Sequence, residues 1–208
     1  MKLNREVKGF TLLELLVVLA IVAIISAVGY PNFLSWSKDR EVRQATEKLA
    51  SSITTINTYT QRGTYPFTQL LIEPGASGVV FTIKGKDKQS LSNLINAGTA
   101  ITCDTADATF WSNNQIKSYD LADVYVHFDN GSAICFSKNA DNYLETGDIL
   151  GQDAVVDDSN VEVDNYIIIC GSDSDCDTDP QRPAYMVVWS QFGNVSRFKY
   201  SGDDWVRQ

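Results

Sequence analysis

The sequence predicts an α+β protein in which a long N-terminal helix packs on an antiparallel β-sheet head. Three observations lead to this prediction. Residues 10–30 form an apolar run of membrane length, residues 35–62 carry an amphipathic helical pattern, and from residue 65 onward short strand patterns alternate with turn signals. A helix with one apolar face, followed by antiparallel hairpins, favours an architecture in which that face covers one side of a sheet.

The composition of the chain excludes several classes of protein. Of its 208 residues, 44% are hydrophobic, 21% charged and 11% aromatic, which excludes a disordered chain, a collagen-like repeat and a protein with many membrane spans. The formal net charge of −9 makes direct nucleic-acid binding unfavourable, because an acidic surface repels the phosphate backbone. A single histidine leaves little room for histidine-based catalysis or a metal site with several histidines.

A short basic segment, residues 1–9, precedes the apolar run. Residues 10–30 contain Glu14 as their only charged side chain, and as a helix they would span about 31 Å, the thickness of a bilayer core. The basic flank is expected to stay in the cytoplasm. A secretory signal peptide fits poorly, because the apolar run is too long and no small-residue cleavage site follows it. A plain membrane anchor would leave Glu14 unexplained.

Glu14 requires a partner, since an unpaired carboxylate in a membrane helix costs on the order of 2–3 kcal/mol. If the chain is cut after Gly9, the new amino group of Phe10 lies four residues before Glu14 on the same face of the helix. Glu14 can then pair with that amine in its own chain or in a neighbouring subunit. The pairing between subunits would fix their axial register.

Residues 8–15, KGFTLLEL, followed by an apolar helix, resemble the class III signal of type IV pilins and type II secretion pseudopilins. The resemblance covers about residues 5–35 and implies the pilin fold. It also implies that a prepilin peptidase removes residues 1–9 by cutting after Gly9 and methylates the new N-terminal Phe10. In this family the glutamate at the position of Glu14 guides subunits into a helical filament.

The helix is expected to continue past the membrane segment, residues 10–34, into an amphipathic half, residues 35–63. Apolar side chains recur there at steps of three and four residues, so one face is suited to pack on a core. Gly63 supplies a stop signal. Gly29 and Pro31 are predicted to weaken the helix between its halves, because proline removes an N–H donor and clashes with the preceding turn. Pro31 also resembles the proline at which pilin helices bend or melt.

Residues 64–208 are predicted to form the β-rich head. Two hairpins are expected, one with residues 129–131 as its loop and one around residues 192–193. We also expect one or two helical turns over residues 89–97. The predicted strands are residues 79–84, 124–128, 132–136, 165–170, 185–191 and 194–200.

Four cysteines lie in the head. An even number in an exported domain predicts two disulfides, and of the three possible pairings we favour Cys103 with Cys135 and Cys170 with Cys176. Free buried thiols and a zinc site are the alternatives. The chain has no C-x-x-C spacing, which speaks against zinc.

Four carboxylates alternate in residues 171–180, GSDSDCDTDP. They would repel one another, and Ca²⁺ would offset that repulsion through oxygen ligands. The segment departs from an EF-hand loop, since Thr178 replaces the turn glycine and Ala184 stands where a bidentate glutamate would be. A solvated acidic loop that keeps a filament soluble is the alternative. The four residues are Asp173, Asp175, Asp177 and Asp179.

No hydrolase, metalloprotease, P-loop or dinucleotide-binding fingerprint occurs in the sequence, and we expect His127 to be a structural residue of an exposed strand. The chain is therefore expected not to be an enzyme and to require no cofactor other than the possible Ca²⁺. A DNA receptor would need a basic strip, such as Arg197, Lys199 and Arg207, on one face.

By resemblance, the expected function is that of a structural subunit of a type IV pilus. We favour a minor pilin that acts in assembly initiation or at the tip, in adhesion, motility or DNA uptake. The alternatives are a major pilin, a type II secretion pseudopilin, and an adhesin or ligand-binding module displayed on the pilus. The implied partners are other pilin subunits, the prepilin peptidase and the inner-membrane assembly platform. The subunit would span the bacterial inner membrane once, with a periplasmic head, before joining an extracellular pilus or a periplasmic pseudopilus.

Overall fold

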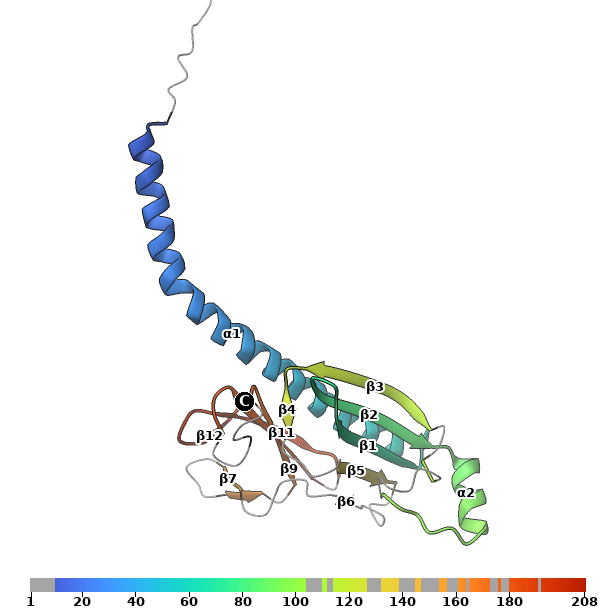
Figure 1. Ribbon diagram of the computed structural model, residues 1–208. Helices are drawn as coiled ribbons and strands as arrows, with labels where there is room; N and C mark the ends of the chain where they lie inside the picture. The colour runs from blue at the N-terminus through green and yellow to red at the C-terminus, as the bar shows by residue number, and fades with distance from the viewer. Residues whose placement is uncertain are drawn as a thin grey trace, which may run out of the picture. The chain divides into compact units, whose positions relative to one another are not determined.

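The computed structural model describes most of the chain, which divides into two compact units, Met1–Lys38 and Asp39–Gln208 (Figure 1). The side chains of residues 28–32, 145–146, 154–156 and 161–163 are not described. The described residues are 10–103, 110–111, 114–126, 132–138, 145–146, 154–156, 161–163, 165–172, 176, 180–190 and 192–208.

One long helix, α1, covers Leu12–Gln61 and contributes to both units. Its backbone is helical through Gly29 and Pro31, so these two residues do not end the helix. A proline inside a helix loses a single hydrogen bond, a cost that the other turns of a helix of 50 residues can offset. Within the described part of the chain, no helix combines the length and the apolarity that a membrane crossing requires.

The second unit contains two five-stranded antiparallel sheets and a small two-stranded one. The strand order is β3-β2-β1-β5-β6 in the first sheet, β12-β11-β10-β9-β4 in the second and β7-β8 in the third. A helix followed by antiparallel sheets confirms the predicted α+β class. The elements are β1 (Phe67–Pro74), β2 (Gly78–Lys86), α2 (Lys88–Asn96), β3 (Gln115–Ala122), β4 (Tyr125–Val126), β5 (Ser132–Ser137), β6 (Glu145–Thr146), β7 (Ala154–Val156), β8 (Val161–Val163), β9 (Tyr166–Cys170), β10 (Ala184–Trp189), β11 (Val195–Tyr200) and β12 (Trp205–Arg207).

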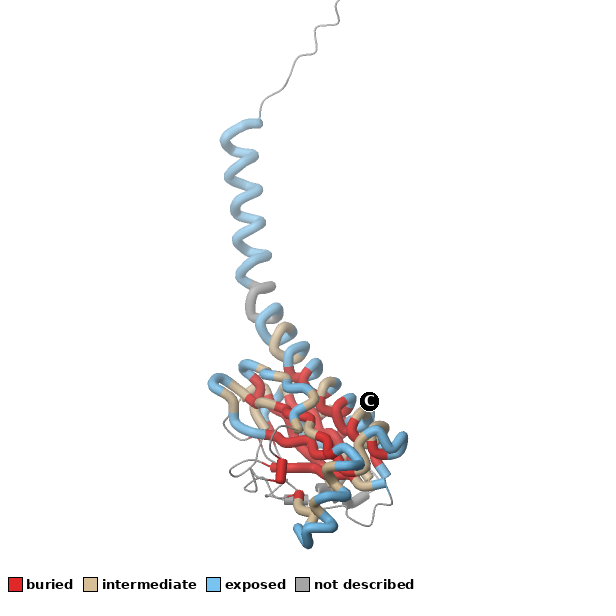
Figure 2. Tube along the Cα trace, turned by 90° about the vertical axis from the view of Figure 1, so that its right-hand side faces the viewer, coloured by how far each residue is buried: buried red, intermediate tan, exposed pale blue. Residues whose placement is uncertain are grey.

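The main core of the second unit lies between α1 and the two large sheets, where Figure 2 shows the buried trace in red. The α1 side chains in it recur at steps of three and four residues, as the sequence predicted, and form one apolar stripe. Burying each aliphatic side chain of this kind contributes roughly 1.5–3 kcal/mol, so the stripe fixes this half of α1 to the head. The stripe consists of Val42, Ala45, Leu49, Ile53 and Ile56, all at most 1% exposed.

The hairpin predicted around residues 192–193 is confirmed. Strand β10 pairs antiparallel with β11. In the turn between them Gly193 has φ +75°, and a Cβ at this position would overlap the side chain of Asn57 on α1. Asn57 Nδ2 donates a hydrogen bond of 2.8 Å to the carbonyl oxygen of Phe192, so the turn packs closely against the helix.

The hairpin predicted for residues 124–136 is wrong. Strand β4 pairs with β9 in the second sheet, whereas β5 pairs with β1 and β6 in the first. Residues 132–136 at the start of β5 are all buried, and a central strand of this kind requires a neighbour on each side. Strands β4 and β5 therefore belong to different sheets. Residues 127–131, which include His127, lie outside the described residues.

Candidate functional site

The start of α1 carries the residues with the most specific sequence signal. Thr11 precedes the helix, and its Oγ1 accepts a hydrogen bond of 3.2 Å from the backbone N–H of Glu14. The carbonyl oxygen of Thr11 accepts from the N–H of Leu15 at 3.2 Å, which is the first helical hydrogen bond. Thr11 is thus the N-cap residue, and Glu14 lies in the first turn, where the helix dipole favours a carboxylate.

The sequence interpretation missed the role of Thr11. The pattern Thr11-x-x-Glu14 before an apolar run is the signature of a capping box, in which the hydroxyl of the first residue receives the N–H of the fourth. That signal was available from the sequence alone. Gly9, the predicted cleavage position, lies outside the described residues, and of Gly29 and Pro31 only the helical backbone is described.

The first part of α1 exposes apolar side chains around its whole circumference. Every described side chain of residues 10–27 is exposed, including Phe10 at 82% and Leu12 at 79% (Figure 2). A helix that is apolar all round is stable only where lipid or other helices cover it. Farther along, the rings of Phe33 and Trp36 lie 6.1 Å apart, and both are more than half exposed. An exposed apolar surface of this kind is a candidate for contact with lipid or with other protein chains.

Ion pairs join α1 to the second sheet at the start of the second unit. Asp39 Oδ1 lies 2.9 Å from Lys199 Nζ, and the hydroxyl of Tyr185 donates to the same carboxylate at 3.1 and 3.2 Å. The hydrogen bond to Asp39 raises the pKa of Lys199. Burial raises the pKa of Tyr185. Eight residues along α1, Glu47 pairs with Arg197.

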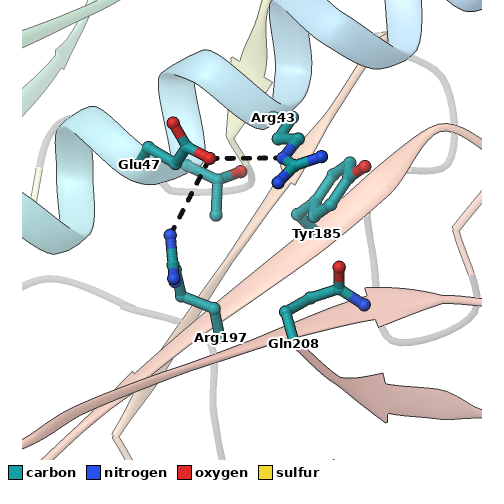
Figure 3. A pocket seen from close by; sticks show the side chains of 6 residues that line it. Arg43, Glu47, Tyr185, Arg197 and Gln208 are labelled. Carbon is teal, nitrogen blue, oxygen red and sulfur yellow. Dashed lines mark hydrogen bonds and ion pairs between the residues drawn. The ribbon is translucent and has the colours of Figure 1, made fainter.

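A small cavity of about 130 Å³ lies beside these ion pairs. Figure 3 shows Glu47 between two guanidinium groups, with its Oε1 at 3.2 Å from Arg43 Nε and at 3.9 Å from Arg197 Nη1. The side chains of Arg43 and Arg197 are 61% and 43% exposed, so this is a partly solvated charge cluster. Its lining pairs no nucleophile with a base, which does not favour catalysis. The lining residues are Arg43, Thr46, Glu47, Tyr185, Arg197 and Gln208.

The three basic residues that could have formed a DNA-binding strip lie on two faces. Arg197 and Lys199 are two positions apart in β11, so their side chains lie on the same face of the strand. This face points toward α1, where Arg197 pairs with Glu47 and Lys199 pairs with Asp39. Arg207 in β12 stands opposite Phe198 in the register, and its Nη2 donates to Ser196 Oγ at 3.2 Å on the other face. The three cations thus lie on two faces of the sheet, and carboxylates pair with two of them. They do not form the continuous positive surface that a nucleic acid requires.

Two disulfides link the cysteines of the head, Cys103 with Cys135 and Cys170 with Cys176. These are the two pairs that the sequence analysis favoured. Gln69 in β1 is fully buried, and its Nε2 donates a hydrogen bond of 3.0 Å to the carbonyl oxygen of Cys103. This hydrogen bond holds the backbone at Cys103, the first cysteine of the disulfide with Cys135, against the first sheet.

The predicted calcium ligands Asp173, Asp175, Asp177 and Asp179 lie outside the described residues. Among the residues that are described, no group of three or more histidine, cysteine, aspartate or glutamate side chains could hold a metal ion.

Comparisons with known proteins agree with the sequence signal at the start of α1. Residues 4–30 match the family described as Prokaryotic N-terminal methylation motif. A fimbrial protein of Neisseria meningitidis serogroup B is 30% identical over 137 residues, which cover 64% of this chain and 74% of that protein. The type IV major pilin protein PilE1 of Neisseria gonorrhoeae is 29% identical over 164 residues, 74% of this chain and 72% of that protein.

A shorter match is much closer in sequence. The type IV wide pilus major component PilA4 of Thermus thermophilus is 59% identical over 34 residues, 16% of this chain and 26% of that protein. No solved structure matches the chain.

Proposed function

Because the chain belongs to the type IV pilin family, and is therefore a structural subunit of a pilus and not an enzyme, we propose that it acts as a minor pilin in assembly initiation or at the tip. One observation carries this proposal. A short match reaches 59% identity, whereas matches that extend over more than half of the chain reach only 27–32%. The family motif in residues 4–30, combined with low identity in the longer matches, is what a specialised subunit of a shared filament needs.

Residues 1–9 are the proposed leader, removed by a prepilin peptidase after Gly9, with methylation of Phe10. Residues 10–34 would then hold the subunit in the bacterial inner membrane with the head in the periplasm, and later pack in the core of the filament. The continuous apolar surface of residues 10–27 supports this proposal, because lipid and neighbouring helices can both cover it. The partners would be other pilin subunits and the inner-membrane assembly platform.

Glu14 would set the register between subunits by pairing with the N-terminal amine of a neighbour. The hydrogen bond that caps the helix at Thr11 uses the backbone N–H of Glu14. The carboxylate of Glu14 is the group proposed to act in assembly. Substitution Glu14→Ala keeps that N–H, so it should leave cleavage intact and abolish filaments. Sheared filaments, examined by electron microscopy and immunoblotting, provide the measurement. Normal filaments from the variant would remove the register role.

The cleavage position is tested by Gly9→Ser. The variant should stay in its precursor form, with an intact mass that includes residues 1–9 and no methyl group. Normal processing of this variant would show that the bond after Gly9 is not the scissile bond.

The minor role is tested by abundance. A minor pilin should form a small fraction of the subunits in sheared filaments, and its deletion should lower the number of filaments without changing their main component. If this chain dominates the filaments by quantitative mass spectrometry, it is a major pilin.

Calcium binding by residues 173–179 stays a prediction. Calorimetric titration of the protein with millimolar Ca²⁺ tests it, and the absence of both binding heat and a thermal shift would remove the site.

A further inference from the structure

We propose that Lys48 on α1 and Lys117 on β3 form a docking point for an acidic side chain on the head of a neighbouring pilus subunit. This inference rests on the proposed function, assembly into a pilus, and adds to it one place on the head where two subunits meet. The carboxylate of the neighbour binds both ammonium groups and so fixes the position of one head beside the other.

The two lysines meet at one aromatic ring. Lys48 Nζ lies 4.3 Å and Lys117 Nζ 4.8 Å from the ring centroid of Tyr119, so the two ammonium groups lie within about 9 Å of each other, close to the distance over which salt screens exposed charges. Tyr119 stands opposite the completely buried Phe81 in the register of β2 and β3 and packs against the main core. The docking point therefore spans the helix and the end strand of the first sheet (Figure 1).

Neither lysine has an acidic partner within the described part of the chain. The pKa of Lys117 is raised by its hydrogen bond to Tyr119 and, less, by Tyr59, and no carboxylate among the described residues contributes to this rise. The face of a ring attracts a cation through its quadrupole, which is a weaker attraction than that of a full negative charge. The two ammonium groups therefore repel each other at this ring, and an incoming carboxylate offsets the repulsion.

The flank of α1 that contacts the second sheet is arranged differently. There Glu47 lies between Arg43 and Arg197 (Figure 3), and Asp39 pairs with Lys199 at 2.9 Å. Each of these three cations has a carboxylate from its own head. The buried half of α1 thus carries neutralised cations on the side of the second sheet and uncompensated cations on the side of the first, which is where a carboxylate from outside the chain fits.

The charge of the chain indicates which kind of group occupies the docking point. The sequence contains 26 acidic and 17 basic residues, so an acidic side chain is the charged group that a similar subunit offers most often. A carboxylate can accept hydrogen bonds from two ammonium groups at once, because it has two acceptor oxygens. A nucleic acid or an anionic lipid surface extends over a wide area and would meet the acidic remainder of the chain, whereas a single side chain needs only the two lysines.

Carbodiimide cross-linking of sheared filaments provides the direct test. The reagent couples a lysine amine to a carboxylate in contact with it and takes up the water that is released, so an amide bond joins the two side chains. Peptide mass spectrometry should find Lys48 or Lys117 joined to an aspartate or glutamate of another subunit. Lys199 and Asp39 are the internal control, because they should be joined within one chain.

Variants of the two lysines test the effect on assembly. A chain with both Lys48→Gln and Lys117→Gln should enter sheared filaments about fivefold less than the unmodified chain, because two charged contacts are lost. A chain with Lys48→Arg and Lys117→Arg keeps both charges and should assemble normally. Lys199→Met is the matched control, since it removes a lysine that already has a carboxylate in its own head. Urea unfolding of the glutamine variant should match that of the unmodified chain, which separates an assembly defect from a folding defect.

Three results would overturn the inference. They are normal incorporation of the glutamine variant, an equal loss of incorporation in Lys199→Met, and the absence of cross-links from both lysines to another subunit. Failure of the proposed function is recognised separately, because the unmodified chain would then be missing from sheared filaments, and the inference would fall with it.

Discussion

The two parts of α1 place apolar side chains in opposite surroundings. In residues 10–27 every described side chain is exposed, and leucine, valine and isoleucine occur on all sides of the helix. In the second unit the apolar side chains of α1 form one stripe, and Leu49, Ile53 and Ile56 in it are completely buried. The difference follows from the sequence pattern, which is apolar all round in the first part and amphipathic in the second.

This comparison shows that the two parts of the helix acquire their stability in different ways. The second part packs on its own head, whose core includes residues from both large sheets. The first part has no such core within the described chain, so in the proposed pilus lipid or other subunits would cover its apolar side chains. Substitutions in the two parts should therefore affect different measurements, head unfolding for one and assembly for the other.

The largest effect on head stability is expected for Ile53→Ala, which leaves a cavity between α1 and the sheets. Its free energy of unfolding should fall by about 2–5 kcal/mol, because the side chain is completely buried. Urea unfolding of the full chain in micelles, followed by tryptophan fluorescence, measures this. Ile21→Ala, at a side chain that is 51% exposed, is the matched control and should leave head unfolding unchanged. A similar loss from both variants would contradict the division.

The disulfides rank next and act only on the head. Loss of the bond between Cys103 and Cys135, with a sequence separation of 32, should lower the free energy of unfolding by about 4 kcal/mol. The bond between Cys170 and Cys176, with a separation of 6, should contribute about 2 kcal/mol, since a shorter loop restricts the unfolded chain less. Double serine variants of each pair, compared in urea, test this order. A larger loss from the 170–176 pair would contradict the chain-entropy account.

The helical pattern could be predicted from sequence because it depends on local periodicity, but β1 could not be. In that strand Thr68 and Gln69 are completely buried, which a sequence pattern does not anticipate. Thr68 Oγ1 bonds to the carbonyl oxygen of Ile56 and lies 2.8 Å from Thr60 Oγ1 on α1, and Gln69 donates to Cys103. These partners come from distant segments, so the sequence does not show which buried polar atoms are paired; Gln69 Oε1 itself is buried without a hydrogen-bond partner among the described residues.

The same limit explains why one hairpin prediction was wrong and why the contacts between α1 and the second sheet were not predicted. The turn signal at residues 129–131 is local, whereas the pairing of β4 and β5 is decided by which sheet buries each strand. Glu14 was identified from one short segment. The link between Asp39 and Tyr185 joins residues separated by 146 positions, and no local pattern predicts it.

The smallest effect is expected at the pair of Asp39 and Lys199, which binds the start of the buried half of α1 to the head. Both side chains are about a third exposed, so at neutral pH Lys199→Met should cost less than about 1 kcal/mol of unfolding free energy.

The pKa of Lys199 is raised in the folded state, so its contribution is fully present below the unfolded pKa of about 10.4. It is lost as pH rises through the higher folded pKa, where lysine releases its proton and the pair no longer forms. The unmodified chain and the variant should therefore differ in urea unfolding at pH 7 and converge as the pH rises above the folded pKa of Lys199. A difference that stays constant over this range would assign the effect to the packing of the lysine stem over the ring of Tyr185, where Nζ lies 5.4 Å from the centroid, and not to the charge.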